Sequence, residues 1–270
     1  MKRYGQHFLI DESVRDAIIA ASGAGRDDLV IEIGPGKGAL THELAGKAGI
    51  LVAVEIDHTL AEQLKQVYDD RSDVFIVHGD ILECDIERLI EDAIVHRSGR
   101  KPERCKVVAN LPYYITTPVL RMLLHYSSLF SELVLMVQLE VAERLIASAG
   151  DSSRSVLSLL AQYYTEPSIV MHIGPECFSP PPLVDSAVVR LAVRPTPPVS
   201  ADEPLLFKLV EAGFAQRRKT IRNAISASGI VPGGSAQVGV VLERAGIDGK
   251  LRAEQLSLDQ FAALARACAR

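Results

Sequence analysis

The chain has 270 residues, of which 48% are hydrophobic and 23% are charged, and its formal net charge is −5. This length suits one large domain plus a small one, and the composition is that of an ordinary globular protein. No apolar run approaches the ~20 residues that cross a bilayer, and the N-terminal segment lacks the apolar core of a signal peptide. We therefore expect a cytoplasmic protein with no membrane partner.

The cysteines are widely scattered and include no C-x-x-C pair: Cys84, Cys105, Cys177 and Cys268. A zinc site or a disulfide framework needs cysteines at closer, more regular spacings. We expect neither a metal site nor disulfides.

Strand-like and helical segments alternate over the first two thirds of the chain. A helical pattern that carries Val14 and Ile18 on one face comes first, and a buried strand at residues 29–33 follows it. Further strands are predicted at residues 51–55, 74–77, 106–109, 133–137, 168–173 and 187–193, with helices at 59–68, 118–126 and 138–148. This alternation predicts a parallel, doubly wound, Rossmann-like α/β sheet.

The last third of the chain departs from this alternation. Only a proline-rich loop at residues 175–182 separates the last two strands, which leaves no room for a crossover helix and predicts an antiparallel hairpin at one edge. Residues 194–204 contain four prolines and predict a linker. Beyond it the apolar periodicity is helical, and Ser257 and Gln260 form a capping box. We predict an α/β domain over residues 1–198 and a small all-helical domain over residues 199–270.

A glycine-rich loop follows the strand at residues 29–33. Gly34, Gly36 and Gly38 allow positive φ and a close approach of the backbone to a ligand. No Gly-Lys-Ser/Thr triplet follows, so a phosphate-binding P-loop is excluded. The dinucleotide fingerprint is satisfied in its Gly/Ala form, with Glu55 placed 21 residues after Gly34, so a nicotinamide dehydrogenase stays open. An ordinary strand-to-helix turn is the plain alternative.

Four predicted strand ends line up, at Gly34, Glu55, Asp80 and Asn110. In an open α/β sheet the ligand lies outside the carboxyl ends of the strands. A carboxylate at Glu55 accepts two hydrogen bonds and suits both hydroxyls of a ribose, and Asp80 suits an adenine amino group. Each acid alone is as consistent with a helix cap or a solvated loop, but four aligned strand ends favour a nucleotide site.

The tetrapeptide Asn110-Leu111-Pro112-Tyr113 indicates methyl transfer to an exocyclic amine. The lone pair of such an amine is delocalised into the base, and two carbonyl acceptors draw it out of conjugation. The side chain of Asn110 and the backbone of Leu111 supply these acceptors, and Pro112 stiffens the turn. Tyr113 offers an aromatic face to a flipped base. An Asx-Pro turn without a function is the alternative.

Successive motifs now resemble one known family, the ribosomal RNA adenine N6,N6-dimethyltransferases. The resemblance covers nearly the whole chain in order and is carried by these segments: residues 5–9 (GQHFL), 32–36 (EIGPG), 55–57 (EID), 79–80 (GD), 110–113 (NLPY), 178–188 (FSPPPLVDSAV) and 216–223 (QRRKTIRN). Members are class I methyltransferases that use S-adenosylmethionine. The resemblance implies dimethylation of two neighbouring adenosines near the 3′ end of small-subunit ribosomal RNA.

The resemblance also implies roles for residues at matching positions. Phe178 would be a second aromatic residue that stacks on the target base, opposite Tyr113. Catalysis would need no general base, only positioning and desolvation. The cofactor would be bound by His7, Leu9, Gly34, Gly36, Glu55, Ile56, Asp80, Ile81 and Asn110. Two positions depart from the common pattern: His7 replaces a frequent asparagine, and Arg154-Ser155 replaces a common Tyr-Gly.

A basic run near the C-terminus predicts an RNA contact. It consists of Arg217, Arg218, Lys219 and Arg222, with no acidic residue between Ala212 and Ser228. Guanidinium groups suit phosphate oxygens, although a solvated face is the simpler interpretation. Residues 201–270 carry 10 Lys and Arg against 7 Asp and Glu, so the negative charge of the whole chain does not exclude RNA.

The leading hypothesis is therefore a small-subunit rRNA adenine dimethyltransferase. Its expected partner is small-subunit ribosomal RNA within a partly assembled small subunit, and we expect a monomer. The alternatives are a large-subunit rRNA adenine N6-methyltransferase of the macrolide-resistance type, a non-catalytic ribosome assembly factor of the same fold, and, as an outsider, a dehydrogenase.

Overall fold

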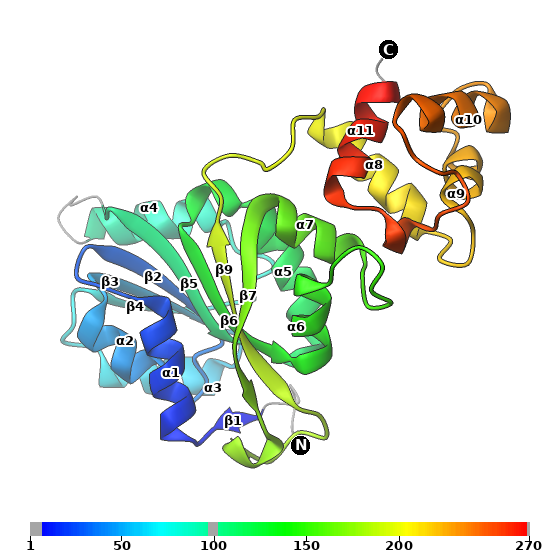
Figure 1. Ribbon diagram of the computed structural model, residues 1–270. Helices are drawn as coiled ribbons and strands as arrows, with labels where there is room; N and C mark the ends of the chain where they lie inside the picture. Colours follow the sequence, from blue (N-terminus) through cyan, green and yellow to red (C-terminus); the bar gives the residue numbers. More distant parts are fainter. Residues whose placement is uncertain (1–6, 97–101, 269–270) are drawn as a thin grey trace. The chain divides into compact units, whose positions relative to one another are not determined.

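A computed structural model describes residues 7–96 and 102–268 (Figure 1). Gly5 and Gln6 of the first motif lie outside the described residues. One sheet has seven strands in the order β4-β3-β2-β5-β6-β9-β7, and a second sheet pairs β1 with β8. The strands are β1 (Phe8–Leu9), β2 (Asp28–Ile33), β3 (Ile50–Glu55), β4 (Val74–His78), β5 (Arg104–Asn110), β6 (Glu132–Gln138), β7 (Thr165–Ile173), β8 (Phe178–Ser179) and β9 (Ser186–Val193).

The large sheet confirms the predicted doubly wound topology with an antiparallel edge hairpin. All neighbouring pairs from β4 to β6 are parallel. Strand β9 is antiparallel to both β6 and β7, so β7 forms the edge. The central strands β2, β5 and β6 are almost entirely buried, which explains why apolar residues dominate the middle of each strand.

Helices cover both faces of this sheet (Figure 1). One hydrophobic cluster joins α1, α2 and α3 to sheet residues such as Val30, Val108 and Val188, while α4 and α5 lie on the other face. None of the helices within the described ranges is long and apolar enough to cross a membrane. The helices of this part are α1 (Glu12–Ser22), α2 (Thr41–Lys47), α3 (His58–Val67), α4 (Ile86–His96) and α5 (Thr116–His125), and α6 (Leu139–Ile146) begins in it and ends in the second unit described below.

The chain reverses its direction of travel across the sheet between β2 and β5. It runs from β2 outward through β3 to β4, and then returns to place β5 on the other side of β2. The crossover loops of β2 and β5 therefore leave in opposite directions and open a crevice at the carboxyl ends of the two strands. Gly34 and Asn110 lie at this crevice.

The small sheet brings the N-terminal segment onto the proline-rich loop. Phe8 pairs with Ser179 and Leu9 with Phe178 in antiparallel register. The backbone N–H of Ile10 extends the ladder by donating to the carbonyl of Cys177 at 2.9 Å. Strands this short leave no periodicity in a sequence, so this pairing was not predicted.

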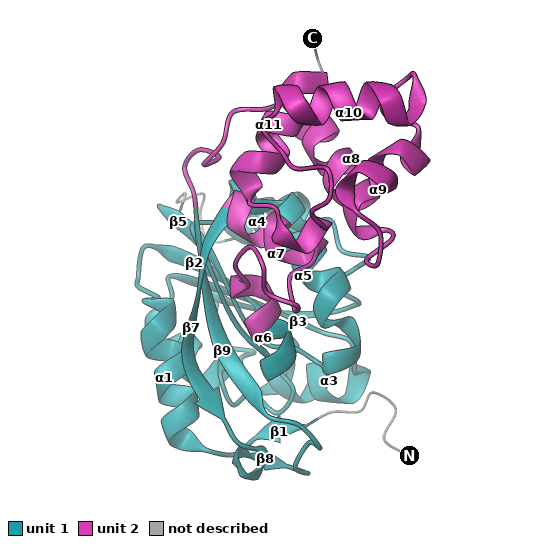
Figure 2. Cartoon of the chain, turned by 45° about the vertical axis from the view of Figure 1, so that its right-hand side comes forward, with its two compact units in different colours: residues 1–142, 165–193 teal, residues 143–164, 194–270 magenta. Residues whose placement is uncertain are grey.

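Contacts divide the chain into two compact units (Figure 2). Unit 1 comprises residues 1–142 and 165–193, and unit 2 comprises residues 143–164 and 194–270. Unit 2 is helical, with the predicted capping box of Ser257 and Gln260 formed by two hydrogen bonds. That residues 199–270 alone form an RNA-binding domain stays a prediction. The helices of this unit are α7 (Val156–Tyr164), α8 (Glu203–Phe214), α9 (Ile221–Ser228), α10 (Gly234–Arg244) and α11 (Leu258–Cys268).

The core of unit 2 explains why α7 groups with it. Leu159 and Tyr163 of α7 belong to one buried cluster with Leu206, Leu209 and Phe261 of the C-terminal helices. The sequence analysis included the segment of α7 in the α/β domain predicted over residues 1–198, because it lies between two strands of the sheet. Its apolar face is buried against residues that follow it by more than forty positions.

Candidate active site

A cavity of about 600 Å³ lies at the carboxyl ends of the strands in unit 1. Segments from the N-terminus, the ends of β2 to β5 and the strand β8 line it. Every residue predicted to bind cofactor or to act in catalysis is among its lining residues: His7, Leu9, Gly34, Gly36, Glu55, Ile56, Asp80, Ile81, Asn110, Leu111, Pro112, Tyr113 and Phe178. The individual roles of these residues stay predictions.

The glycine loop forms one wall of the cavity through backbone that a side chain would disturb. Gly34 has a φ of 67° and Gly36 one of 59°, a region that favours glycine. A Cβ atom on Gly36 would approach the Phe8 ring to 3.3 Å. The Nζ atom of Lys37 lies 4.7 Å from the centroid of the same ring, in a cation–π contact. The N-terminal segment thus packs directly on the loop.

Glu55 ends β3 and is only 1% exposed. Its Oε2 accepts from the N–H of Gly36 and its Oε1 from the N–H of Asp57, both at 2.9 Å. A carboxylate has about four lone-pair sites, so each oxygen keeps capacity for a further donor. The buried acid therefore offers two fixed acceptors to the cavity, as a pair of vicinal hydroxyls requires.

A second acid lies beside apolar side chains at the end of β4. Asp80 lines the cavity, and its Oδ1 accepts from the N–H of Leu82 at 3.0 Å. Ile81, which is 4% exposed, and Ile56 line the same region. Apolar walls with one oriented carboxylate suit a flat heterocycle that carries an amino group.

Asn110 ends β5, the strand next to β2. Its Nδ2 donates to the backbone carbonyl of His7 at 3.4 Å, which leaves its side-chain carbonyl as an acceptor. The N–H of Leu111 donates to the carbonyl of Met136 on β6 at 3.1 Å, so the sheet also fixes the backbone that follows. Both acceptors that the sequence predicted are thus held by rigid neighbours.

Tyr113 is held at both its ring and its hydroxyl. Its ring stacks on the His7 imidazole with centroids 5.8 Å apart and planes 26° apart. Its hydroxyl lies 2.7 Å from the hydroxyl of Ser186, the first residue of β9. Burial raises the pKa of Tyr113, and the bond to Ser186 offsets part of this rise. The phenol therefore stays protonated at neutral pH.

Phe178 lines the cavity but is buried more deeply than a stacking platform would require. It is 3% exposed and belongs to the hydrophobic cluster that also contains Leu9 and Cys177. Its place in β8 fixes it opposite Leu9. Its predicted stacking on a target base stays a prediction.

Glu32 is a cavity residue that the sequence analysis quoted in a motif but assigned no role. It is 1% exposed, and its Oε2 has no hydrogen-bond partner among the described residues. Burial raises its pKa to about 8, and the charge of Glu55 adds to this effect. The sequence did contain a sign that Glu32 is unusual, because it is an acid within a strand that is otherwise apolar and predicted to be buried.

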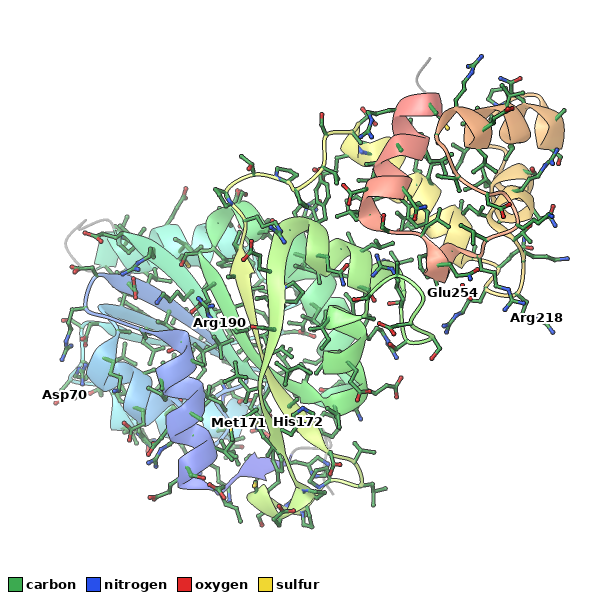
Figure 3. The ribbon with its side chains drawn as sticks, in the orientation of Figure 1. Asp70, Met171, His172, Arg190, Arg218 and Glu254 are labelled. Atoms are coloured by element: carbon green, nitrogen blue, oxygen red, sulfur yellow. The ribbon has the colours of Figure 1, made fainter. Side chains whose placement is uncertain are left out.

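The predicted RNA-binding residues lie in unit 2 and have unequal surroundings. Arg217 donates to the carbonyl of Ser152 at 2.6 Å, and Arg222 donates to the carbonyl of Ser235 at 3.0 Å. Arg218 and Lys219 are exposed. Figure 3 shows Arg218 at the turn between α8 and α9 with its side chain directed away from the helices. The structure thus gives two of the four cations backbone partners within the protein.

Arg154, where the sequence departs from the common pattern, is a buried residue. It is 2% exposed, and its guanidinium donates to the carbonyl of Ala147 and, at 3.3 Å, to the side-chain oxygen of Gln162. Burial lowers its pKa. These contacts join the loop before α7 to α7 itself, within unit 2.

A cavity at the switch point of a parallel sheet, with a glycine loop after β2 and an acid at the end of β3, is typical of Rossmann-like nucleotide-binding proteins. The family model described as "Ribosomal RNA adenine dimethylase" matches residues 1–270. The chain belongs to this family.

Similar proteins of known name agree with this membership. The chain is 47% identical to the "Ribosomal RNA small subunit methyltransferase A" of Pelotomaculum thermopropionicum over 98% of this chain and 90% of that protein. It is 44% identical to the protein of the same name from Moorella thermoacetica, over 98% and 91% of the two chains. Among solved structures, a dimethyladenosine transferase from Plasmodium falciparum has a TM-score of 0.77 at 25% identity, with 96% of both chains covered.

A second solved structure is similar in fold. The 23S rRNA methyltransferase ErmE has a TM-score of 0.72 at 26% identity, and the similarity covers 97% of this chain and all of that chain. The sequence identity to it is well below that to the small-subunit methyltransferases.

Proposed function

We propose that this protein transfers methyl groups from S-adenosylmethionine to the N6 amines of adenosines in small-subunit ribosomal RNA. The observation that carries the proposal is the combination of 47% identity to a small-subunit methyltransferase with a cavity that contains the whole Asn110 to Tyr113 segment. We place the target at two adjacent adenosines near the 3′ end of that RNA, each converted to N6,N6-dimethyladenosine during ribosome biogenesis.

The donor set of the cavity fits S-adenosylmethionine. Gly36 lines the cavity and lets the loop pack on Phe8, because a Cβ atom there would approach the Phe8 ring to 3.3 Å. Glu55 presents carboxylate oxygens that are already oriented by backbone N–H groups, and these suit the ribose hydroxyls. Asp80, with Ile56 and Ile81 nearby, suits the adenine ring and its amino group. When bound, this cofactor supplies a sulfonium methyl group that is open to attack by a nucleophile.

The segment from Asn110 to Tyr113 binds and orients the target adenine. The side-chain carbonyl of Asn110 and the backbone carbonyl of Leu111 each accept one N–H of the adenine amine, and this returns the lone pair to the nitrogen. Pro112 holds the two carbonyls in a fixed turn. Tyr113 stacks on the base, and the buried walls exclude water. Most of the rate enhancement comes from this positioning, because no side chain needs to take a proton before the methyl group moves.

The substrate outside the cavity is RNA, and we propose that unit 2 contacts its phosphates. Arg218 and Lys219 are exposed and suit phosphate oxygens. We further propose that the protein acts as a monomer on a partly assembled small subunit. The large-subunit activity is the weaker candidate because the relatives at 47% and 44% identity are named small-subunit methyltransferases. A non-catalytic assembly factor would have no need for an intact Asn110 to Tyr113 segment.

The test is transfer of labelled methyl from S-adenosylmethionine to small ribosomal subunits that lack adenine dimethylation, with large subunits as the control. We expect label in N6,N6-dimethyladenosine of the small-subunit RNA. Label only in the large subunit would support the resistance-type activity. Label in neither, with the cofactor still bound, would support a non-catalytic assembly factor.

A further inference from the structure

Ser186 connects the large sheet to the ring of Tyr113. It is the first residue of β9, it is fully buried, and it pairs with Gln138 of β6 and Ile173 of β7. A residue between two strands in a close-packed interior has little freedom to move. Its hydroxyl lies 2.7 Å from the hydroxyl of Tyr113. The hydrogen bond therefore joins a fully buried residue of the large sheet to a residue of the cavity.

Tyr113 depends on such an anchor because its own backbone lies outside the sheet. It begins a short 3₁₀ helix, Tyr113–Ile115, which follows Pro112. Short helices of this type have poorer hydrogen-bond geometry than strands. A hydrogen bond at the hydroxyl fixes the far end of the ring and so limits rotation about the first side-chain torsion. Rotation of the ring about its own long axis leaves the hydroxyl in place, and the stacked His7 imidazole faces the ring.

We propose that Ser186 is a positioning residue for methyl transfer. Its hydrogen bond fixes where the Tyr113 ring lies beside the cavity, so that a stacked adenine presents its N6 amine to the carbonyls at Asn110 and Leu111. The inference rests on the proposed function, because it takes adenine as the base that stacks. Ser186 itself acts only through Tyr113 and does not contact the reacting atoms.

If Ser186 acts only through its hydrogen bond to Tyr113, the effects of substituting the two residues should not be additive. We would measure kcat and KM on unmethylated small subunits for Ser186→Ala, Tyr113→Phe, the double variant and Ser186→Cys. Each of the first two removes the same hydrogen bond, so each is expected to lower kcat about fivefold, the scale of one such bond. The double variant should be no slower than either single variant. Ser186→Cys keeps the size and a weak donor and should recover part of the loss.

A measurement of ring motion tests the anchor without any reaction. In protein with ¹³C-labelled tyrosine, the Tyr113 signal is assigned by its loss in Tyr113→Phe. Three-bond couplings to the Tyr113 Cγ atom should report one χ1 rotamer in the wild type and an average of rotamers in Ser186→Ala, while the dissociation constant for S-adenosylmethionine stays the same. A merely structural role for Ser186 would weaken cofactor binding together with kcat and would leave the double variant slower than both single ones.

Several outcomes would overturn the inference. These are additive losses in the double variant, wild-type kcat in Tyr113→Phe, or a Tyr113 χ1 rotamer that does not respond to Ser186→Ala. If Ser186→Ala does not fold, the kcat values of Tyr113→Phe and Ser186→Cys decide, and wild-type kcat in both variants would refute the role of Ser186. An inactive wild-type enzyme would refute the proposed function instead, and the rotamer measurement would still decide whether Ser186 anchors Tyr113.

Discussion

The carboxylate of Glu55 accepts a hydrogen bond from the backbone N–H of Gly36 at 2.9 Å. This bond joins the acid at the end of β3 to the glycine loop that follows β2. Each therefore orients the other before any ligand binds. A change in the loop and a change in the acid should both act on cofactor affinity, for different physical reasons.

Gly36→Ala should weaken binding of S-adenosylmethionine at least about tenfold. An alanine at the φ of 59° costs about 1–2 kcal/mol, and its Cβ atom would meet the Phe8 ring at 3.3 Å. Relief of this strain moves the loop that orients Glu55. Calorimetric titration measures the affinity. Gly46→Ala is the matched control, because Gly46 lies in α2 with open space around it. Equal affinities of the two variants would refute the role of the loop.

Glu55→Gln should weaken cofactor binding about tenfold to a hundredfold, the scale of losing one or two hydrogen bonds to a charged group. A glutamine replaces one acceptor oxygen by an NH₂ group that faces a backbone N–H, from either Gly36 or Asp57. Glu62→Gln on the same stretch of chain is the control, since its exposed pair with Lys65 contributes little. Unchanged affinity in Glu55→Gln would exclude Glu55 from the ribose site.

Asn110→Ala should lower kcat at least about a hundredfold, the scale of one preorganised polar contact to a transition state. Its side-chain carbonyl is the acceptor that draws the lone pair of the amine out of conjugation. Cofactor affinity should change only severalfold, because Glu55 and Asp80 remain. Rapid-quench single turnovers measure the chemical step directly. Near-normal turnover would contradict the assigned chemistry.

Glu32→Gln should flatten the dependence of stability on pH. Glu32 has a pKa of about 8 in the folded protein against an ordinary value of 4.5, so the folded state binds its proton more tightly than the unfolded state. Its contribution to stability is therefore complete below pH 4.5 and is lost as the pH rises toward 8. Urea unfolding across this range measures the slope, with exposed Glu87→Gln as the control. Parallel slopes for wild type and Glu32→Gln would refute the shift.

Replacing Arg218 and Lys219 by alanine should weaken RNA binding and reduce the slope of log K against log salt by about 1 per lost phosphate contact. Thermal stability should not change, because both side chains are exposed. Arg222→Ala is the contrasting variant. It removes the hydrogen bonds to Ser235 and should lower the melting temperature. A salt slope that the double variant leaves unchanged would assign Arg218 and Lys219 to a solvated surface.

The sequence by itself determined the layers of unit 1 and the location of its site. Buried strands such as residues 29–33 are recognisable because an apolar run that ends at glycine is a local signal. If the strands are parallel, their carboxyl ends lie along one edge of the sheet. Gly34, Glu55, Asp80 and Asn110 are therefore predicted to lie at that edge. The edge hairpin followed from the length of the loop between its strands.

Only the tertiary structure decided which distant segments meet. The pairing of β1 with β8 and the bond between Tyr113 and Ser186 join residues whose separation in sequence carries no periodic signal. The sequence also does not distinguish the four basic residues of unit 2, whereas the structure gives them different surroundings. The pKa of Glu32 also depends on complete burial by the fold. Local patterns report which face of an element is buried, whereas contact partners and electrostatic environment depend on the path of the whole chain.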